Sequence, residues 1–266
     1  MTRPAPRLVA TDLDGTIVRS DGTVSDRTRA AIAAVEEAGA SFVMVTGRPT
    51  RWMRAVAEQT GHHGVAVCAN GALVYDLHTE SVVRSFLLSS AAAREVVEAL
   101  RDAIPGIAFA VERLEEGFAH EPAYRPRWDS ADPRTQAPVE HLLSSDVVKL
   151  LARHEELGSD ELLAAARAAV ASGATLTHSS SDGLLEISAA DVSKASGLAS
   201  LAAERGVAAA EVVAFGDMPN DLPMLSWAGL GVAVANAHPE VLAVADEVTA
   251  SNDDDGVAAV LDRWFA

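Results

Sequence analysis

VATDLDGTIV, residues 9–18, places two aspartates one residue apart directly after a short apolar run. A buried strand gains nothing from Asp12 and Asp14, and Gly15 marks the point where the run ends. Two interpretations are open for this stretch alone. The acids belong either to a solvated turn, for which Asp-Gly is typical, or to a site that handles a metal ion and a phosphate.

The overall charge limits the kinds of partner that this protein can have. Among its 266 residues, 38 acids face 21 lysines and arginines, for a formal net charge of −17. We expect no nucleic-acid partner, because affinity for a phosphate backbone depends on clustered basic side chains. A small phosphorylated molecule stays possible, since a bound metal ion can reverse the local field.

The sequence also predicts a cellular compartment. Cys68 is the single cysteine, so an internal disulfide is excluded and a reducing compartment is favoured. No apolar stretch precedes the first acid as in a signal peptide, and no window approaches the roughly 18 apolar residues of a membrane span. We therefore expect a cytoplasmic protein with no membrane partner.

Short apolar runs recur along both ends of the chain, and helical patterns separate them. Runs that are apolar at nearly every position predict strands buried on both faces of a parallel sheet; they lie at residues 7–10, 41–45, 64–69, 211–215 and 231–235. One helix is expected from Ser25 to about Gly39 and another before Gly206. The alternation predicts a doubly wound, Rossmann-like α/β core with a parallel sheet.

The middle of the chain has a different pattern. Strand-like runs occur there in adjacent pairs with turn residues between them, as in GIAFAVERLEEGFAHE and ATLTHSSSDGLLEIS. Such pairs predict hairpins and a largely antiparallel sheet, so residues 83–189 are expected to form an inserted α+β cap. The core is then discontinuous, with residues 1–82 and 190–266 in one domain.

Polar residues and glycines follow each predicted core strand. In order, the five runs are followed by TDLDGT, TGR, NG, GDMPND and NAHPE. Open parallel sheets bind ligands at the carboxyl ends of their strands. One shared site at that edge of the sheet is therefore predicted.

The residue types at this edge suit phosphoryl transfer. Asp12 is a candidate nucleophile towards phosphorus, and Asp14 a candidate general acid and base. Gly15 permits a close approach of the backbone to the phosphate, to which Thr16 can donate. Asp217 and Asp12 together offer the hard oxygen ligands that Mg²⁺ prefers.

The remaining strand-end residues each have two interpretations. Asn220 and Asp221 either support a metal site or cap the next helix, although capping explains only one of the two acids in GDMPND. Thr46 either donates to a phosphoryl oxygen or belongs to an ordinary turn before Pro49. Lys194 opens a predicted helix, where a cation opposes the helix dipole, so a partner elsewhere is expected for it: a phosphate and the acids.

Taken together, the order DxDGT, TGR, Lys and GDxxND resembles the haloacid dehalogenase superfamily, and most closely its Cof-like phosphatases with an inserted cap. The resemblance covers nearly the whole chain. It implies a Mg²⁺-dependent phosphatase that acts on a small phosphorylated metabolite through an aspartyl-phosphate. Sugar phosphates, nucleotides and phosphorylated cofactors all fit.

The resemblance also implies residue roles. Asp12 matches the nucleophile and a metal ligand, and Asp14 the general acid/base with its main-chain carbonyl on the metal. Thr46, with Gly47, and Lys194 match the phosphate-binding groups, and Asp217 the metal-binding acid. The supporting positions are Gly15, Thr16, Arg48, Asn70, Gly71, Asn220 and Asp221, with Asn70 and Gly71 in the loop that these phosphatases place under the substrate.

The cap loop at 120–136 contains Arg125, Arg127 and Trp128, which are unusual in so acidic a chain. Guanidinium groups pair with phosphate or carboxylate and an indole stacks on a sugar or base, so these three are candidates for substrate binding. Solvated arginines and a structural tryptophan are the alternative. His120 and Glu121 are weaker candidates.

Two other features are expected to have no metal site, namely the His62–His63 pair and the run at 251–256, which we interpret as a turn and helix cap. Two other functions stay open: a phosphosugar mutase or similar phosphotransferase, and a non-catalytic metabolite sensor. Whether the protein is a monomer or a homodimer is also open.

Overall fold

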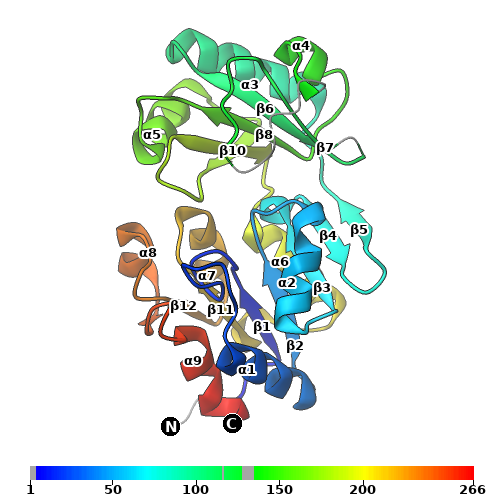
Figure 1. The fold of residues 1–266 in the computed structure, drawn as a ribbon, viewed down its shortest axis with the longest axis vertical. Helices are drawn as coiled ribbons and strands as arrows, with labels where there is room; N and C mark the ends of the chain where they lie inside the picture. Colours follow the sequence, from blue (N-terminus) through cyan, green and yellow to red (C-terminus); the bar gives the residue numbers. More distant parts are fainter. Residues whose placement is uncertain (1–3, 116, 128–134) are drawn as a thin grey trace. The chain divides into compact units, whose positions relative to one another are not determined.

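The computed structural model describes residues 4–115, 117–127 and 135–266 (Figure 1). The chain forms two compact units. One contains residues 1–84 and 193–266, and the other contains residues 85–192.

The first unit is built on an eight-stranded sheet with the order β13-β12-β11-β1-β2-β3-β4-β5. From β13 to β3 all neighbours are parallel, whereas β4 runs antiparallel to β3. The strands are β1 (Leu8–Thr11), β2 (Ser41–Val45), β3 (Val65–Cys68), β4 (Leu73–Asp76), β5 (Ser81–Ser85), β11 (Val212–Gly216), β12 (Leu230–Ala233) and β13 (Glu247–Val248). The central strands β1 and β11 are buried at every position, as expected for strands with covered faces.

Helices cover both faces of this sheet. The chain moves outwards from β1 to β2 and β3 in one direction and from β11 to β12 and β13 in the other, so right-handed crossovers place the two sets of helices on opposite faces. One layer contains α1 (Asp26–Glu37), α2 (Met53–Thr60) and α9 (Gly256–Phe265), and the other contains α6 (Lys194–Glu204), α7 (Leu222–Trp227) and α8 (Pro239–Val244). The Ser25 hydroxyl accepts a hydrogen bond from Thr28 N, which starts α1 where the sequence predicts.

The second unit has a five-stranded antiparallel sheet with the order β7-β6-β8-β10-β9. Its elements are α3 (Ser90–Ala103), β6 (Ala108–Arg113), β7 (Gly117–His120), α4 (Val139–Leu142), β8 (Lys149–Arg153), α5 (Ser159–Ala169), β9 (Ala174–Thr177) and β10 (Leu184–Ala189). Phe109, Leu150 and Ile187 pack in one cluster with residues of α3 and α5. Ala108 and Ala110, the neighbours of Phe109, belong to a smaller apolar cluster with Tyr124 instead. The helices therefore cover one face of this sheet.

The predicted fold class is confirmed: a doubly wound α/β core carries an α+β unit between two of its segments. The sequence analysis did not include α2 or β4, and it placed the start of the insertion at residue 83, within β5. The structure places β5 beside β4 in the core sheet instead. Most of β5 is exposed, so its apolar pattern did not distinguish a core edge from a cap. No helix within the described ranges is both long and apolar enough to cross a bilayer.

Candidate active site

The candidate site lies where β1 and β11 end. These strands are parallel neighbours, with Thr11 opposite Phe215, and Asp12 N donates to Phe215 O at 2.9 Å. Asp12 follows β1 directly, and Asp217 follows β11. The register therefore brings together acids from the two chain segments of the core, as the pattern at the strand ends predicts.

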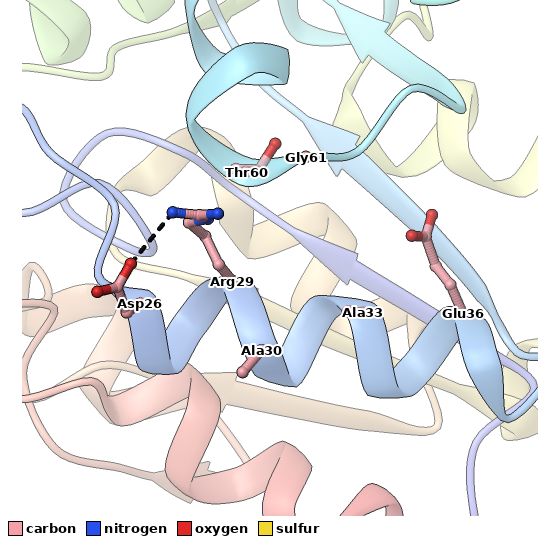
Figure 2. A pocket seen from close by; sticks show the side chains of 7 residues that line it. All are labelled: Asp26, Arg29, Ala30, Ala33, Glu36, Thr60 and Gly61. Carbon is pink, nitrogen blue, oxygen red and sulfur yellow. Dashed lines mark hydrogen bonds and ion pairs between the residues drawn. The ribbon is translucent and has the colours of Figure 1, made fainter.

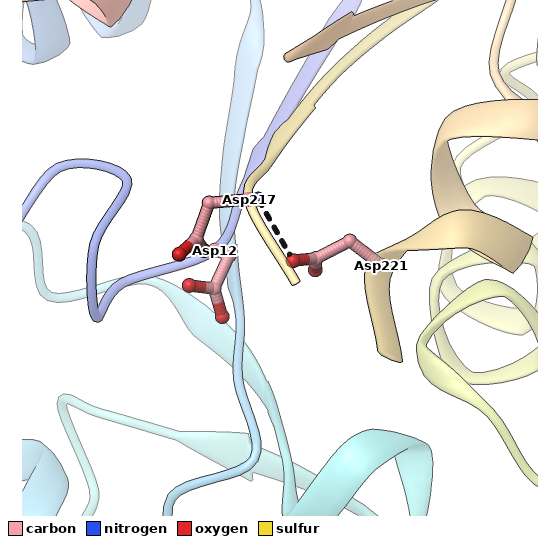
Figure 3. A group of neighbouring side chains, drawn as sticks. All are labelled: Asp12, Asp217 and Asp221. Carbon is pink, nitrogen blue, oxygen red and sulfur yellow. Dashed lines mark hydrogen bonds between the residues drawn. The ribbon is translucent and has the colours of Figure 1, made fainter. Parts of the chain in front are cut away.

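Three buried carboxyl groups meet at this point. Among the residues that the structure describes, only Asp12, Asp217 and Asp221 form a group of acidic, histidine or cysteine side chains close enough to share a metal ion, with ligand atoms within 4.8 Å of one another (Figure 3). Burial raises the pKa of Asp12 to about 7; Asp221 and Asp14 add to this, and Lys194 opposes it. Burial, followed by the charges of Asp12 and Asp221, raises the pKa of Asp217 to about 9. The site holds more negative charge than its single lysine offsets.

Lys194 has the partners that its position at the start of α6 predicts. Its Nζ lies 2.5 Å from Asp12 Oδ1 and 2.6 Å from Asp221 Oδ1, and all three side chains are buried. Burial alone would lower the pKa of Lys194, but the two carboxylates raise it above its usual value. The lysine is therefore a fixed positive charge at the centre of the site.

Asp221 differs from the other two acids in its contacts. Its Oδ2 accepts hydrogen bonds from Asp217 N at 3.1 Å and Met218 N at 3.0 Å, while Oδ1 pairs with Lys194. Both oxygens are thus engaged in holding the turn after β11 and the lysine. We therefore interpret Asp221 as an anchor, which leaves Asp12 and Asp217 as the acids with capacity for a metal ion.

The donor set fits Mg²⁺. It consists of hard carboxylate oxygens. Burial and the neighbouring acids raise the pKa values of Asp12 and Asp217, so negative charges on both carboxylates are unfavourable without a cation. A buried Mg²⁺ would offset this charge. The resemblance to the haloacid dehalogenase superfamily implies the main-chain carbonyl of Asp14 as a third ligand.

The loop after β1 makes close contact with Asp217. Gly15 has φ +81°, and a Cβ at this position would lie 2.3 Å from Asp217 Oδ2. Thr16 Oγ1 donates to Asp217 Oδ1 at 3.0 Å. We expected the glycine to admit a phosphate and the threonine to donate to it. In the structure both residues lie against Asp217, and their contact with a phosphate stays a prediction.

Arg48 holds Asp14 in a bidentate ion pair. Arg48 Nε lies 2.7 Å from Asp14 Oδ2, and Nη2 lies 2.5 Å from Oδ1. Thr46 is buried at the end of β2, and its Oγ1 accepts from Arg48 N at 3.0 Å, which leaves the hydroxyl proton to donate. Gly47 lies in the turn between them. The TGR segment therefore links Asp14, the candidate acid/base, with Thr46, a candidate hydrogen-bond donor to the phosphate.

The Asn70–Gly71 loop approaches the start of α6. Gly71 has φ +101°, and a Cβ there would lie 2.0 Å from Ser193 O, so no larger residue fits. Asn220 Nδ2 donates to Asn70 Oδ1 at 3.0 Å between two buried side chains. The loop after β3 and the turn after β11 are thus joined directly.

The predicted cap candidates have mixed surroundings. Arg125 is exposed, and Arg127 is exposed and pairs with Asp182 at 3.0 Å. Trp128 lies outside the described residues. His120 and Glu121 are buried: the His120 ring bonds Glu121 O, and the Glu121 carboxylate accepts from Phe109 N and pairs with Arg101. These local contacts give His120 and Glu121 structural roles.

The histidine pair and a surface groove lie apart from the predicted residues. His62 is buried, and its Nδ1 lies 2.7 Å from Glu36 Oε1. A groove of about 330 Å³ lies between α1 and the end of α2. Figure 2 shows the residues that line it. Its charged lining residues are Asp26, Glu36 and Arg29, and Arg29 pairs with Asp26. The other lining residues are small. None of the predicted site residues lines this groove.

Sequence reasoning missed two asparagines near the site. Asn236 Nδ2 donates to Gly15 O at 2.8 Å, and Asn252 Nδ2 donates to Val18 O at 2.9 Å. The polar segment after the fifth strand was a signal for Asn236. The turn at 251–256 was interpreted as a solvated turn, yet Asn252 is buried.

Comparison with known proteins agrees with this geometry. The sequence profile of the haloacid dehalogenase-like hydrolases matches residues 9–261. This chain belongs to that family. The match spans both segments of the core and the insertion between them, so the predicted family is confirmed.

Similar proteins support the same assignment. The Bacillus subtilis (strain 168) protein named "Putative phosphatase YxeH" is 30% identical, over 95% of this chain and 96% of that protein. The 5-amino-6-(5-phospho-D-ribitylamino)uracil phosphatase YcsE of the same organism is 28% identical, over 97% and 95%. A solved haloacid dehalogenase-like hydrolase from B. subtilis is 25% identical, with a TM-score of 0.79 over 96% of this chain and 99% of that one. The predicted enzyme class, a phosphatase, is thereby confirmed.

Proposed function

We propose that this phosphatase of the haloacid dehalogenase-like hydrolases cleaves a small phosphate monoester with Asp12 as its nucleophile. The observation that carries the proposal is the buried group at the ends of β1 and β11, where Asp12 lies beside Lys194 and Asp217. A carboxylate in this setting is held for reaction by fixed charges. Catalysis of phosphoryl transfer rests mainly on such positioning and charge neutralisation.

In the first step the Asp12 carboxylate attacks phosphorus, and the bond from phosphorus to the ester oxygen breaks. Asp14 gives a proton to the leaving oxygen, and the product is an aspartyl-phosphate on Asp12. The Thr46 hydroxyl donates a hydrogen bond to a phosphoryl oxygen, and Lys194 supplies positive charge beside that oxygen. Since Arg48 holds Asp14 as a carboxylate in an ion pair, Asp14 takes a proton from solvent and leaves this pair before the first step.

In the second step Asp14 accepts a proton from a water molecule, whose oxygen attacks the phosphorus of the aspartyl-phosphate. The phosphorus–Asp12 bond breaks, inorganic phosphate leaves, and both aspartates return to their starting states. The same carboxyl group thus acts first as an acid and then as a base.

We propose Mg²⁺ as the cofactor, held by Asp12 and Asp217 together with the main-chain carbonyl of Asp14. The ion would offset the negative charge of the site so that an anionic substrate can approach. Thr16 and Asp221 keep Asp217 and its turn in place through the hydrogen bonds described above.

The substrate is proposed to be a phosphorylated sugar, nucleotide or cofactor. YcsE, whose name specifies a phosphorylated ribityl-aminouracil, supports a small metabolite. Residues 83–189 are proposed to select the substrate, with Arg125, Arg127 and Trp128 as candidates. A cytoplasmic location is proposed on the basis of the single buried Cys68.

A test combines a panel of phosphorylated metabolites with Mg²⁺ and measures released phosphate. Asp12→Asn should abolish release while its circular dichroism spectrum stays that of the wild type. Asp21→Asn is the matched control, because Asp21 lies in the same loop and is exposed, with its carboxylate bonded to Thr23. Wild-type turnover by Asp12→Asn would overturn the proposal.

Labelled water separates hydrolysis from transfer. Hydrolysis in water enriched in ¹⁸O incorporates one labelled oxygen into released phosphate, whereas a phosphotransferase delivers the group to another hydroxyl. Absence of Mg²⁺-dependent turnover on the whole panel would favour a metabolite sensor instead.

A further inference from the structure

The loop that carries the proposed acid/base is held partly by its own backbone and partly by side chains of distant segments. In the segment after β1, the amides of Thr16, Ile17 and Val18 all donate to Leu13 O, at 3.2, 3.1 and 2.8 Å. This tight turn uses one carbonyl three times. The carbonyls of Gly15, within this turn, and Val18, at its end, instead accept hydrogen bonds from side chains of distant segments.

Those side chains belong to Asn236, after β12, and Asn252, in the turn before α9. Asn236 Nδ2 donates to Gly15 O at 2.8 Å, and Asn252 Nδ2 donates to Val18 O at 2.9 Å. The two asparagines are also bonded to each other, because Asn252 N donates to Asn236 Oδ1 at 3.0 Å. The result is a closed ring of hydrogen bonds that joins the Asp14 loop to the C-terminal part of the core.

The turn that contains Asn252 also contacts the loop further along the chain, at Arg19 and Ser20. Ser20 donates to Asp253 through its backbone N at 2.9 Å and its hydroxyl at 2.7 Å. Arg19 Nη2 lies 2.8 Å from Asp255 Oδ1. The turn therefore holds the loop through neutral hydrogen bonds near the site and through charged contacts beyond it.

The turn itself is rigidly built. Asp255 adopts a left-handed conformation with φ 58°, an unfavourable geometry for a residue other than glycine. Gly256 packs so closely that a Cβ would lie 2.0 Å from Ala250 O, and its carbonyl accepts from Thr249 Oγ1 at 2.8 Å. Strained and crowded backbone of this kind persists where the surrounding contacts determine it.

We propose that Asn252 and Asn236 are positioning residues for phosphoryl transfer, which hold the Asp12–Asp14 loop in register with Asp217. This inference rests on the proposed function, because it assigns the positioned group, Asp14, the role of general acid. Gly15 lies in the chain between Asp14 and Thr16, and Thr16 contacts Asp217. The hydrogen bond from Asn236 to Gly15 O therefore holds the backbone between the proposed acid and this contact. Loss of the asparagines displaces the acid more than it displaces Asp12, whose backbone is held by β11.

The leaving group of the substrate distinguishes this role from general structural support. A p-nitrophenolate leaves without protonation, whereas an alkoxide needs the general acid. For Asn252→Ala, we expect kcat/KM to fall about 10- to 100-fold on the best alkyl phosphate of the panel, and only a few-fold on p-nitrophenyl phosphate, as for misplacement of a catalytic group by about 1 Å. Asn236→Ala should act in the same direction, and the double variant should lose little more than either single one.

Asp254→Ala is the matched control. Asp254 lies in the same turn and is exposed, and its carboxylate accepts from Ser251. Hydrogen exchange provides a second measurement that is independent of turnover: amides at 16–20 should exchange faster in Asn252→Ala and unchanged in Asp254→Ala.

Equal losses on both substrates, or unchanged exchange and unchanged kcat/KM in Asn252→Ala, would overturn the inference. Failure of the proposed function itself would be visible separately, as a wild-type protein that releases phosphate from neither substrate with Mg²⁺.

Discussion

Replacement of Lys194 by methionine is expected to destabilise the core strongly and in a pH-dependent way. Lys194 is 1% exposed and makes two ion pairs of 2.5 and 2.6 Å, with Asp12 and Asp221. Removal of one partner from a buried ion pair costs about 3–5 kcal/mol, because the remaining charge is left uncompensated. We therefore expect Lys194→Met to lower the free energy of unfolding by about 3–5 kcal/mol at pH 8, a large share of a typical domain's stability.

The pH dependence of this loss follows from the acids. The two carboxylates raise the pKa of Lys194 against the effect of burial, so the lysine stays charged between pH 5 and pH 9 in the wild type. Without it, the pKa of Asp12 rises further above its present value of about 7, and the acid becomes neutral by binding a proton. The destabilisation should therefore shrink as the pH falls, by about 1.4 kcal/mol per pH unit for each proton taken up.

Urea denaturation without Mg²⁺, followed by circular dichroism at several pH values, measures this loss. Arg27→Met is the control, because Arg27 pairs with Asp262 on the surface and should contribute no more than about 1 kcal/mol. Adding Asp221→Asn to Lys194→Met should recover part of the stability, because it removes a charge that the lysine had offset. A loss below about 1 kcal/mol, or one independent of pH, would refute this account of the site.

Two more predictions concern Asp12 and Asp217, the acids proposed to bind the metal ion. The pKa values of Asp12 and Asp217 are raised in the folded protein, so the folded state binds more protons than the unfolded chain and metal-free stability should fall as the pH rises from about 4 to 9. Melting temperatures in EDTA and in Mg²⁺ should diverge over the same window, and Asp217→Asn should flatten the slope; parallel curves would contradict this. Gly15→Ala should abolish Mg²⁺-dependent phosphate release, since its Cβ would lie 2.3 Å from Asp217 Oδ2, whereas Gly22→Ala, with a similar φ of +83° and open space, should keep the activity. Equal activity in the two variants would show that the close approach is unimportant.

Much of the fold and the site could be predicted from local patterns. Strands buried on both faces need apolar residues at nearly every position, so the runs at 41–45 and 211–215 identified the core strands. The unfavourable position of Lys194 at a helix start predicted a partner, and the structure provides two. The sequence analysis missed β4, which is only four residues long and follows the Asn70–Gly71 loop closely. The apolar residues of β5 are exposed at the edge of the sheet, so their pattern did not show which sheet the strand joins.

Which residue contacts which was decided only by the tertiary structure. The sequence showed that Asp12, Asp14, Asp217 and Asp221 follow strands of one sheet, because chain direction and burial determine strand ends locally. It did not show that Asp221 anchors Lys194, that Arg48 grips Asp14 or that Asn252 supports the Val18 carbonyl. Those bonds join segments far apart in the chain, and the distances and angles that they require exist only once the strands have paired in register.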